Sequence, residues 1–495
     1  MKLAKKISVI FLSAFLLMFA GCSEDYLDTK PTDSVTTDKI FESYDGALAA
    51  LNGTYRLFYA FNIEGFADHN EFGQKSVDLI MDLMGEDMAI HSQGYGWFTD
   101  EYGYNAHSAT KRRTEYFWDY YYNLVNNSNR ILANVDDIDM TEEQYNYIKG
   151  QSLAIRAYAY FYLVRLYQHT YVGHQDAPAV PLYTEPSQSG KGRATVEEVY
   201  TRIESDLEES INLLGNTMAR IHKSHINQSV AQGIMARVKL TKEEWGEAVT
   251  YAQKARDGYS LMDSSSYATT PNKKNGFNNI GNQEWMWGFQ INSEQSTIYA
   301  SWFSHMDPLF MTYAFLGLQK EIYLPLYNKI DNPQSDARAV NFDIDTTVSG
   351  VGNSQLKFLA SDQESFLGDY IMMRAGEMYL IEAEAQAEQG NDTEAQDVLH
   401  ELISKRDANY TKPTETGQDL LDEIYLQRRI SLWGEGFRLL DLKRRKQALD
   451  RTGGNHVPAL AREMQLPAES DLFIFQIPEE EIDVNNNIGP GDQNP

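Results

Sequence analysis

Residues 145–166 read YNYIKGQSLAIRAYAYFYLVRL, and this stretch decides the fold class. Its apolar and small residues recur in alternating steps of three and four, at Tyr145, Ile148, Ser152, Ile155, Ala159, Tyr162 and Leu166. That spacing places them in one stripe along a helix with 3.6 residues per turn. An equivalent stripe lies just upstream, at Phe117, Tyr121, Leu124, Ser128, Ile131 and Val135. The sequence therefore predicts two long helices that follow each other in the chain.

Helical patterns continue outward from these two segments. Residues 195–214 begin with Thr195 and Glu198, which have the spacing of a capping box. Segments 226–257, 374–407 and 418–447 supply further helices. Two of them carry small residues at the spacing of a helical hairpin, at Ala236, Ala248, Ala252, Ala255, Ala383, Ala387 and Ala395. This pattern resembles the tetratricopeptide repeat, whose hairpins must stack to bury their apolar faces.

The segments between the helices have a different composition. Residues 60–114 and 260–370 are rich in Gly, Asn, Ser and aromatic residues, which is typical of long irregular insertions. Alternation from Trp285 to Ile291 predicts a short strand, and residues 473–477 predict another. The expected fold is mainly α, a tetratricopeptide-type helical scaffold with long loop insertions and a few short strands. We expect a single domain over residues 40–495.

The first residues predict export. Lys2, Lys5 and Lys6 precede an apolar run over residues 7–19, and small residues follow, so residues 1–21 are interpreted as a signal peptide. Cys22 is the only cysteine, which excludes a disulfide within the chain. Its position directly after the signal resembles the lipobox of bacterial lipoproteins, and residues 22–39 then form a polar tether. An uncleaved helical anchor and a free thiol are the alternatives.

The charge of the chain limits its partners. The formal net charge is −28, and a surface this acidic repels nucleic acid and anionic membrane surfaces. Lipid at Cys22 would therefore have to provide the attachment to an outer membrane.

Motifs of catalysis and of metal or cofactor binding do not stand out. Neither Gly-x-Ser-x-Gly nor a Walker-type phosphate loop occurs, so we predict no enzyme activity and no cofactor. His222 and His225 lack further ligands in the pattern of a metal site, and Asp343 and Asp345 do not complete a calcium loop. With 71 acidic residues, a catalytic carboxylate pair cannot be identified by spacing, so a glycosidase stays an alternative.

Aromatic residues are the strongest functional signal. Eleven lie between Tyr95 and Tyr122, and those at 95–104 stand among glycines and polar residues, which predicts an exposed aromatic platform. Trp285, Tyr299 and Trp302 belong to a second group. Aromatic faces stack on the C–H faces of sugar rings, and each contact adds about 0.5–1.5 kcal/mol beyond area burial.

Several blocks together resemble the SusD/RagB family of outer-membrane nutrient-binding lipoproteins. They are CSEDYLDTKPT (22–32), ALAALNGTY (47–55), WDYYYNLVNNSNR (118–130), AIRAYAYFYLVR (154–165), the charged residues of 428–444, and IPEEEID (477–483). The resemblance implies a binding protein that lies over a TonB-dependent, SusC-like transporter and delivers glycans, or in some members peptides. Gln427 and Ser431 depart from acidic residues that the family often has, which we expect to alter local packing only.

The predicted ligand residues come from two sources. Trp97 is carried over from the family because its Gly-Trp-Phe setting matches a recurrent binding loop. Loop composition adds the others, which are Tyr95, Tyr102, Trp285, Trp302, Asp68 and Asn70. The leading hypothesis is a lipid-anchored protein of the bacterial cell surface that captures oligo- or polysaccharide. Peptide capture, a surface glycoside hydrolase and a repeat scaffold for proteins are the alternatives.

Overall fold

The computed structural model describes residues 40–62, 65, 67–267, 269–345, 349–350 and 352–495. The predicted signal peptide, Cys22 and the tether over residues 22–39 lie outside the described residues.

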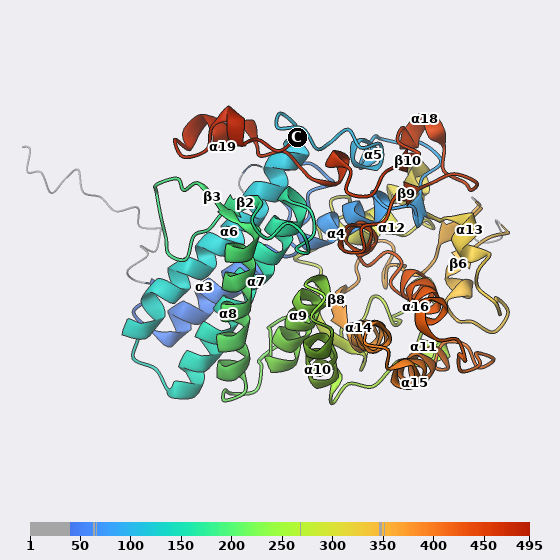
Figure 1. The fold of residues 1–495 in the computed structure, drawn as a ribbon, viewed down its shortest axis with the longest axis horizontal. Coiled ribbons are helices and arrows are strands. Elements are labelled where there is room, and N and C mark those ends of the chain that lie inside the picture. Colours follow the sequence, from blue (N-terminus) through green and yellow to red (C-terminus); the bar gives the residue numbers. More distant parts are fainter. Residues whose placement is uncertain (1–39, 63–64, 66, 268, 346–348, 351) are drawn as a thin grey trace, which may run out of the picture.

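Antiparallel helices packed in a row form the scaffold. It begins with α6 (Arg112–Asn134), α7 (Glu142–Tyr167), α8 (Val196–Leu214), α9 (Gln228–Thr241) and α10 (Trp245–Arg256), each of which contacts the next. α10 packs on α14 (Ala375–Glu388), which contacts α15 (Asp392–Ile403) and α16 (Gly417–Ser431). Figure 1 shows the row running from the left of the molecule to its lower right. The predicted mainly helical, tetratricopeptide-type scaffold is confirmed.

Helix α7 illustrates how the sequence produces this packing. It begins at a capping box in which the Thr141 side chain accepts from the Gln144 backbone, and Gln144 caps Thr141 in return. Both of its long faces are buried, because α6 and α8 pack on it from two sides. Gly150 allows close contact with α8, since a Cβ there would lie 2.8 Å from Leu214 Cγ. Buried Arg156 forms two 2.7 Å hydrogen bonds with Asp206 of α8, which satisfies both charges.

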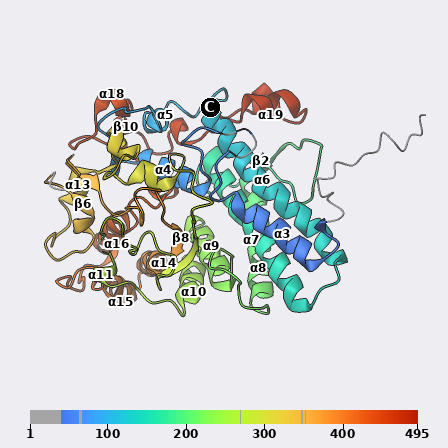
Figure 2. The same cartoon turned by 180° about the vertical axis from the view of Figure 1, so that it is seen from behind.

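The remaining elements are short, apart from one helix that crosses the back of the scaffold. Figure 2 shows this helix, α3 (Tyr44–Arg56), against α6 and α7. The other helices are α4 (Gln74–Leu83), α5 (Thr99–Tyr102), α11 (Ser264–Tyr267), α12 (Trp302–Met306), α13 (Leu324–Tyr327), α17 (Arg438–Arg444), α18 (Pro458–Ala461) and α19 (Glu479–Val484). Single turns are η3 (Val135–Asp137), η4 (Ala314–Leu318), η5 (Ala339–Asn341), η6 (Asp471–Phe473) and η7 (Pro490–Asp492).

Short antiparallel sheets hold the insertions together. The predicted strand is β4 (Trp285–Phe289), which pairs with β8 (Tyr370–Arg374) so that Trp285 lies opposite Arg374. A four-stranded sheet has the order β1 (Met88–Ala89), β5 (Glu321–Ile322), β7 (Ser354–Gln355) and β6 (Phe342–Asp343). Two further pairs are β2 (Pro178–Pro181) with β3 (Arg193–Thr195), and β9 (Leu449–Asp450) with β10 (Gln465–Leu466).

Two expectations for local structure are wrong. Residues 473–477 do not form a strand, because the Phe475 and Gln476 amides donate to single carbonyls of Leu166 and His107 instead of a neighbouring strand. The stretch 60–114, expected to be irregular, contains the fully buried helix α4. Val77, Ile80 and Met81 do recur at helical spacing there, but the composition of the surrounding stretch hides this short helix, and its polar residues are buried as well.

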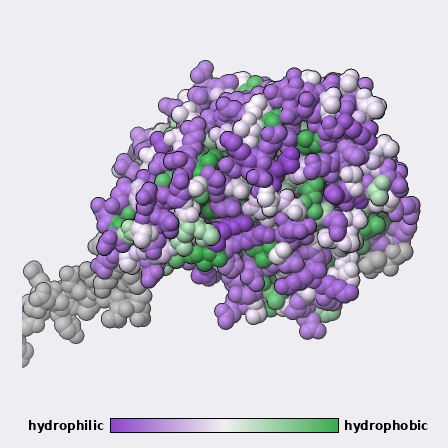
Figure 3. Space-filling model, turned by 90° about the horizontal axis from the view of Figure 1, so that it is seen from below, coloured by the Kyte–Doolittle hydropathy of each residue, from purple (hydrophilic) through white to green (hydrophobic). Residues whose placement is uncertain are grey.

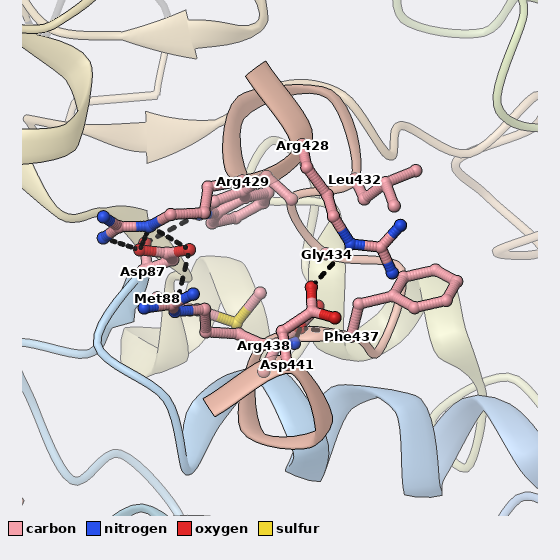
Figure 4. A pocket seen from close by; sticks show the side chains of 11 residues that line it. Asp87, Met88, Arg428, Arg429, Leu432, Gly434, Phe437, Arg438 and Asp441 are labelled. Carbon is pink, nitrogen blue, oxygen red and sulfur yellow. Dashed lines mark hydrogen bonds and ion pairs between the residues drawn. The ribbon is translucent and has the colours of Figure 1, made fainter. Parts of the chain in front are cut away.

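Buried ion pairs join early and late parts of the chain. Figure 4 shows Asp87, beside β1, against Arg429 of α16, and Arg428 against Asp441 of α17. Gln427 and Ser431 stand where the family often has acidic residues. Both accept hydrogen bonds from the buried Arg338 side chain, at 2.7 and 3.0 Å. The departure from acidic residues is thus accommodated by local polar packing.

The face of the molecule seen from below is mostly hydrophilic. On the face seen from below, Figure 3 shows hydrophobic residues only in small separate patches. None of the helices in the described part combines the length and the apolar character that crossing a membrane requires.

Candidate functional site

Five ring side chains from three distant loops meet at one surface, which we call the aromatic surface. Its members are His69, Tyr95, Trp97, Tyr299 and Tyr313. The ring of Tyr313 is itself buried and lies at the centre, with centroids of the other four rings between 5.1 and 5.9 Å away. Tyr95 is the outermost ring, with 64% of its surface exposed, and Trp97 is half-buried.

Loop geometry fixes the position of Tyr95 and Trp97. Gly94 and Gly96 have φ of 49° and 86°, a region that favours glycine, and the turn between them precedes α5. A Cβ at Gly94 would lie 2.7 Å from Leu318 Cγ, so this loop packs directly on η4. The Ser92 hydroxyl donates to the Gly317 carbonyl, which ties the two loops together.

A buried layer supports the aromatic surface from below. His69 Nδ1 and the Tyr313 hydroxyl share a hydrogen bond of 2.6 Å. The fully buried His305 ring stacks on Tyr313 at 5.1 Å, and its Nε2 lies 2.8 Å from the His69 carbonyl. Burial lowers the pKa of His305 well below its usual range, so this ring is neutral at physiological pH. The supporting layer is therefore uncharged at the point where it contacts the rings.

Polar groups flank His69 on the same loop. Asp68 is half-exposed and forms a 3.0 Å ion pair with Arg112 Nε, which also pairs with buried Glu71. The backbone carbonyl of Asn70 accepts hydrogen bonds from the side chains of Ser76 and Arg113. Charged and amide groups beside aromatic faces can exchange hydrogen bonds with hydroxyls of a ligand.

Exposed apolar side chains continue the aromatic surface around Tyr299 and Tyr313. They are Ile298, Phe310, Met311, Phe315 and Leu316, each at least 37% exposed. Clustered exposed apolar residues mark interaction surfaces more often than isolated ones do.

The structure brings some of the predicted ligand residues together and excludes others. Tyr95 and Trp97 belong to the aromatic surface, and Asp68 and Asn70 stand on either side of its member His69. The prediction is corrected for three residues, which are at most 1% exposed and offer no face to a ligand: Tyr102, Trp285 and Trp302.

Each of these three has an internal partner that explains its burial. The Tyr102 hydroxyl lies 2.6 Å from His456 Nδ1, and the Trp285 indole donates to the Gly276 carbonyl at 2.6 Å. The Trp302 ring lies 4.3 Å from the buried Lys75 ammonium. These three rings therefore pack in the core of the protein and do not contact a ligand.

Sequence reasoning missed two members of the aromatic surface, His69 and Tyr313. Nothing in their local pattern marks them, because their position depends on contacts between loops more than 200 residues apart. The sequence groups Tyr299 with Trp285 and Trp302, but of these three only Tyr299 contacts the ring of Tyr313.

Two further features were candidates for a site, the cavity beside Arg428 and Arg429 and the histidine His225. The cavity in Figure 4 has a volume of about 10 Å³, which is room for one water molecule. His225 is a core residue, bonded to Tyr147 and Asn52. Among the described residues, no three His, Cys, Asp or Glu side chains are close enough to hold a metal ion.

Comparison with known families gives two matches, in the first and the last part of the chain. Residues 25–240 match a family model described as "Starch-binding associating with outer membrane", named SusD-like. Residues 347–495 match the model of the SusD family. The chain belongs to the SusD/RagB family.

Individual relatives agree with this assignment. SusD-like protein P38 of Formosa agariphila is 22% identical over 92% of the chain and 94% of its own length. SusD-like protein P2 of the same organism is 26% identical, over 50% of the chain and 46% of its own length. A crystal structure of a SusD-like carbohydrate binding protein from Bacteroides vulgatus superposes with a TM-score of 0.79 and 28% identity, over 91% of this chain and 98% of that one.

Proposed function

We propose that this SusD/RagB member binds glycans at the aromatic surface and delivers them to a TonB-dependent outer-membrane transporter. The observation that carries the proposal is the cluster of Tyr95 and Trp97 around Tyr313. The similarity to a SusD-like carbohydrate binding protein supports the choice of glycans over other ligands.

The chemistry of the aromatic surface fits a neutral sugar chain. Ring faces stack on C–H groups of the sugar, and each such contact contributes at most about tenfold in affinity. Asp68 and Asn70 provide polar groups beside the rings. Few rings give weak binding of a single sugar unit, so an extended polymer that covers several rings binds best. The carboxylates and the net charge of −28 disfavour anionic polysaccharides.

Attachment to the cell surface is part of the same proposal. Acylation at Cys22 would hold the protein at the outer membrane, with residues 22–39 as the tether. Stable attachment requires more than one acyl chain, because each buried methylene contributes only about 0.8 kcal/mol. Labelling with an alkyne-tagged fatty acid tests this part. Wild-type protein is expected to incorporate the label, and Cys22→Ser to remain unlabelled.

Affinity electrophoresis through gels that contain single polysaccharides tests the binding function. At least one neutral polysaccharide is expected to retard the full chain, and Trp97→Ala is expected to abolish most of the retardation. Trp245→Ala is the matched control, because Trp245 is a half-buried tryptophan on α10, outside the aromatic surface. If no polysaccharide retards the protein, or if Trp97→Ala migrates like the wild type, glycan binding at this surface is wrong.

A further inference from the structure

A cavity that shares no residue with the aromatic surface lies in the helical scaffold. It has a volume of about 250 Å³ and lies between α6, the segment after β2, and α19. These elements meet although α19 is more than 300 residues from α6 in the chain, as Figures 1 and 2 both show. We call it the Tyr122 pocket, with the lining residues Asp119, Tyr122, Asn126, Tyr183, Glu185 and Glu481.

Two tyrosine rings form its apolar corner. Tyr122 and Tyr183 meet edge to face, with centroids 5.8 Å apart and planes at 80°. Each hydroxyl has one internal partner, because Tyr122 donates to the Pro181 carbonyl at 2.7 Å and Tyr183 accepts from the Lys191 amide at 3.0 Å. These bonds hold the two rings in place, so their carbon surface is available to an occupant.

The pocket is built before any ligand arrives. The segment that carries Tyr183 and Glu185 is fixed to the scaffold through its backbone. Asn129 donates to the carbonyls of both residues, at 3.1 and 3.3 Å, and the Tyr160 hydroxyl bonds both the amide and the carbonyl of Tyr183. Arg156 holds the carbonyl of the residue between them, at 3.0 Å. A preformed pocket needs little ordering on binding, which favours affinity.

The charge of the pocket is negative. Asp119, Glu185 and Glu481 reach it from its three different walls. Glu481 accepts from the Asn485 amide at 2.7 Å, and within the described part of the chain neither it nor Glu185 forms a salt bridge. No lysine or arginine is among the described lining residues. Glu185 and Glu481, which stand beside aromatic rings and form no salt bridge within the described residues, favour a positively charged occupant.

One contact in the structure already shows this chemistry. The Lys191 ammonium lies 5.4 Å from the Tyr183 ring centroid and donates to the Leu182 carbonyl. Lys191 does not line the cavity, so its presence leaves the pocket itself without a cation.

We infer that the Tyr122 pocket receives a lysine or arginine side chain from another polypeptide. Its volume is below the roughly 300 Å³ at which small-molecule pockets begin, which suits one long side chain. The apolar stem of such a side chain packs on Tyr122 and Tyr183, and its charged end pairs with Glu185 and Glu481. The net charge of −28 steers basic partners toward the protein. This site is separate from the proposed glycan surface and goes beyond that function.

Fluorescence anisotropy of the full chain with two labelled heptapeptides tests the inference. Both probes are made of glycine and serine around one central residue, which is lysine in one and norleucine in the other. The lysine peptide is expected to bind about tenfold more tightly at low salt, and to lose affinity as salt increases. The double substitution Glu185→Gln with Glu481→Gln is expected to remove most of that difference.

Two controls make the result decisive. Glu208→Gln removes an exposed carboxylate of α8 outside the pocket and is expected to leave lysine binding unchanged. Trp97→Ala tests independence, because it should weaken glycan binding and leave peptide binding intact. Equal binding of the two peptides, or an equal loss in Glu208→Gln, would overturn the inference. Displacement of the lysine peptide by a neutral oligosaccharide would also overturn it, in favour of a second sugar site.

Discussion

At the scale of single residues, the exposure of a side chain decides whether it can contact a ligand or belongs to the core. Tyr95 and Tyr102 stand in the same glycine-rich loop, and composition predicts the same role for both. Tyr102 is nevertheless buried, because His456 and Arg451, far along the chain, pack against its ring. The sequence thus predicts that this loop carries an aromatic platform, but partners more than 300 residues away decide which rings face outward.

The hydroxyl of Tyr313 contributes to binding by fixing His69. Tyr313→Phe removes their 2.6 Å hydrogen bond and keeps the ring, so glycan affinity is expected to fall about three- to tenfold. Tyr102→Phe is the matched control, since it removes a similar 2.6 Å tyrosine–histidine bond outside the aromatic surface. Calorimetric titration with the retained polysaccharide measures both. A Tyr313→Phe protein with unchanged affinity would contradict the role given to His69.

The burial of Lys320 is expected to make the stability of the protein depend on pH. Burial lowers the pKa of Lys320 to about 7, whereas the unfolded chain keeps a value near 10.5. Between these two pKa values the unfolded state binds more protons than the folded state. Lys320 therefore makes the free energy of unfolding rise with pH, by at most about 1.4 kcal/mol per pH unit. Lys320→Met removes the buried charge and is expected to stabilise the protein most at pH 7 and progressively less toward pH 9. Urea unfolding at several pH values measures this, and a pH-independent difference would contradict it.

At the scale of elements, helices were predictable where their apolar stripe is local. The stripes of residues 117–135 and 145–166 became α6 and α7. Helix α4 was not predicted, although Val77, Ile80 and Met81 have helical spacing, because it is short and lies in a stretch of loop composition. The burial of its polar Asp82 could not be predicted either, because Asp82 accepts from the backbone of residues 436–438. The strand expected over residues 473–477 fails for a related reason, since a strand needs a partner that local pattern cannot supply.

Helix spacing in the scaffold depends on small residues at the contacts. Gly150→Leu on α7 would place side-chain atoms where Leu214 of α8 lies, and is expected to destabilise the fold by at least about 2 kcal/mol. Gly53→Leu on α3 is the matched control, because no atom lies within 4 Å of its Cβ position. Leucine has a better helix propensity than glycine, so this control is expected to be neutral or slightly stabilising. Thermal unfolding separates the two, and equal midpoints would contradict the close approach of α7 and α8.

At the scale of the whole molecule, buried charge joins segments that are distant in sequence. Glu284 is fully buried and accepts from Arg374, beside α14, at 2.7 Å and from Arg406, after α15, at 2.5 Å. This residue type is normally exposed, so no sequence pattern predicts the site. Other contacts between distant segments assemble the aromatic surface, such as the hydrogen bond between His69 and Tyr313.

Removal of one buried charge should therefore affect the entire fold. Glu284→Gln leaves Arg406 without a compensating carboxylate and is expected to cost about 3–5 kcal/mol. Asp397→Asn is the control, because it breaks the exposed pair with Lys412 and is expected to cost less than about 1 kcal/mol. Denaturant unfolding compares the two, and a similar small loss in both would contradict the structural role of Glu284.

The crystal structure of the protein with the longest soluble fragment of the polysaccharide it retains tests the central claim most directly. The account predicts sugar rings stacked on Trp97 and Tyr95, with hydroxyls near Asp68. Ordered sugar bound elsewhere, with Trp97 and Tyr95 bare, would contradict it.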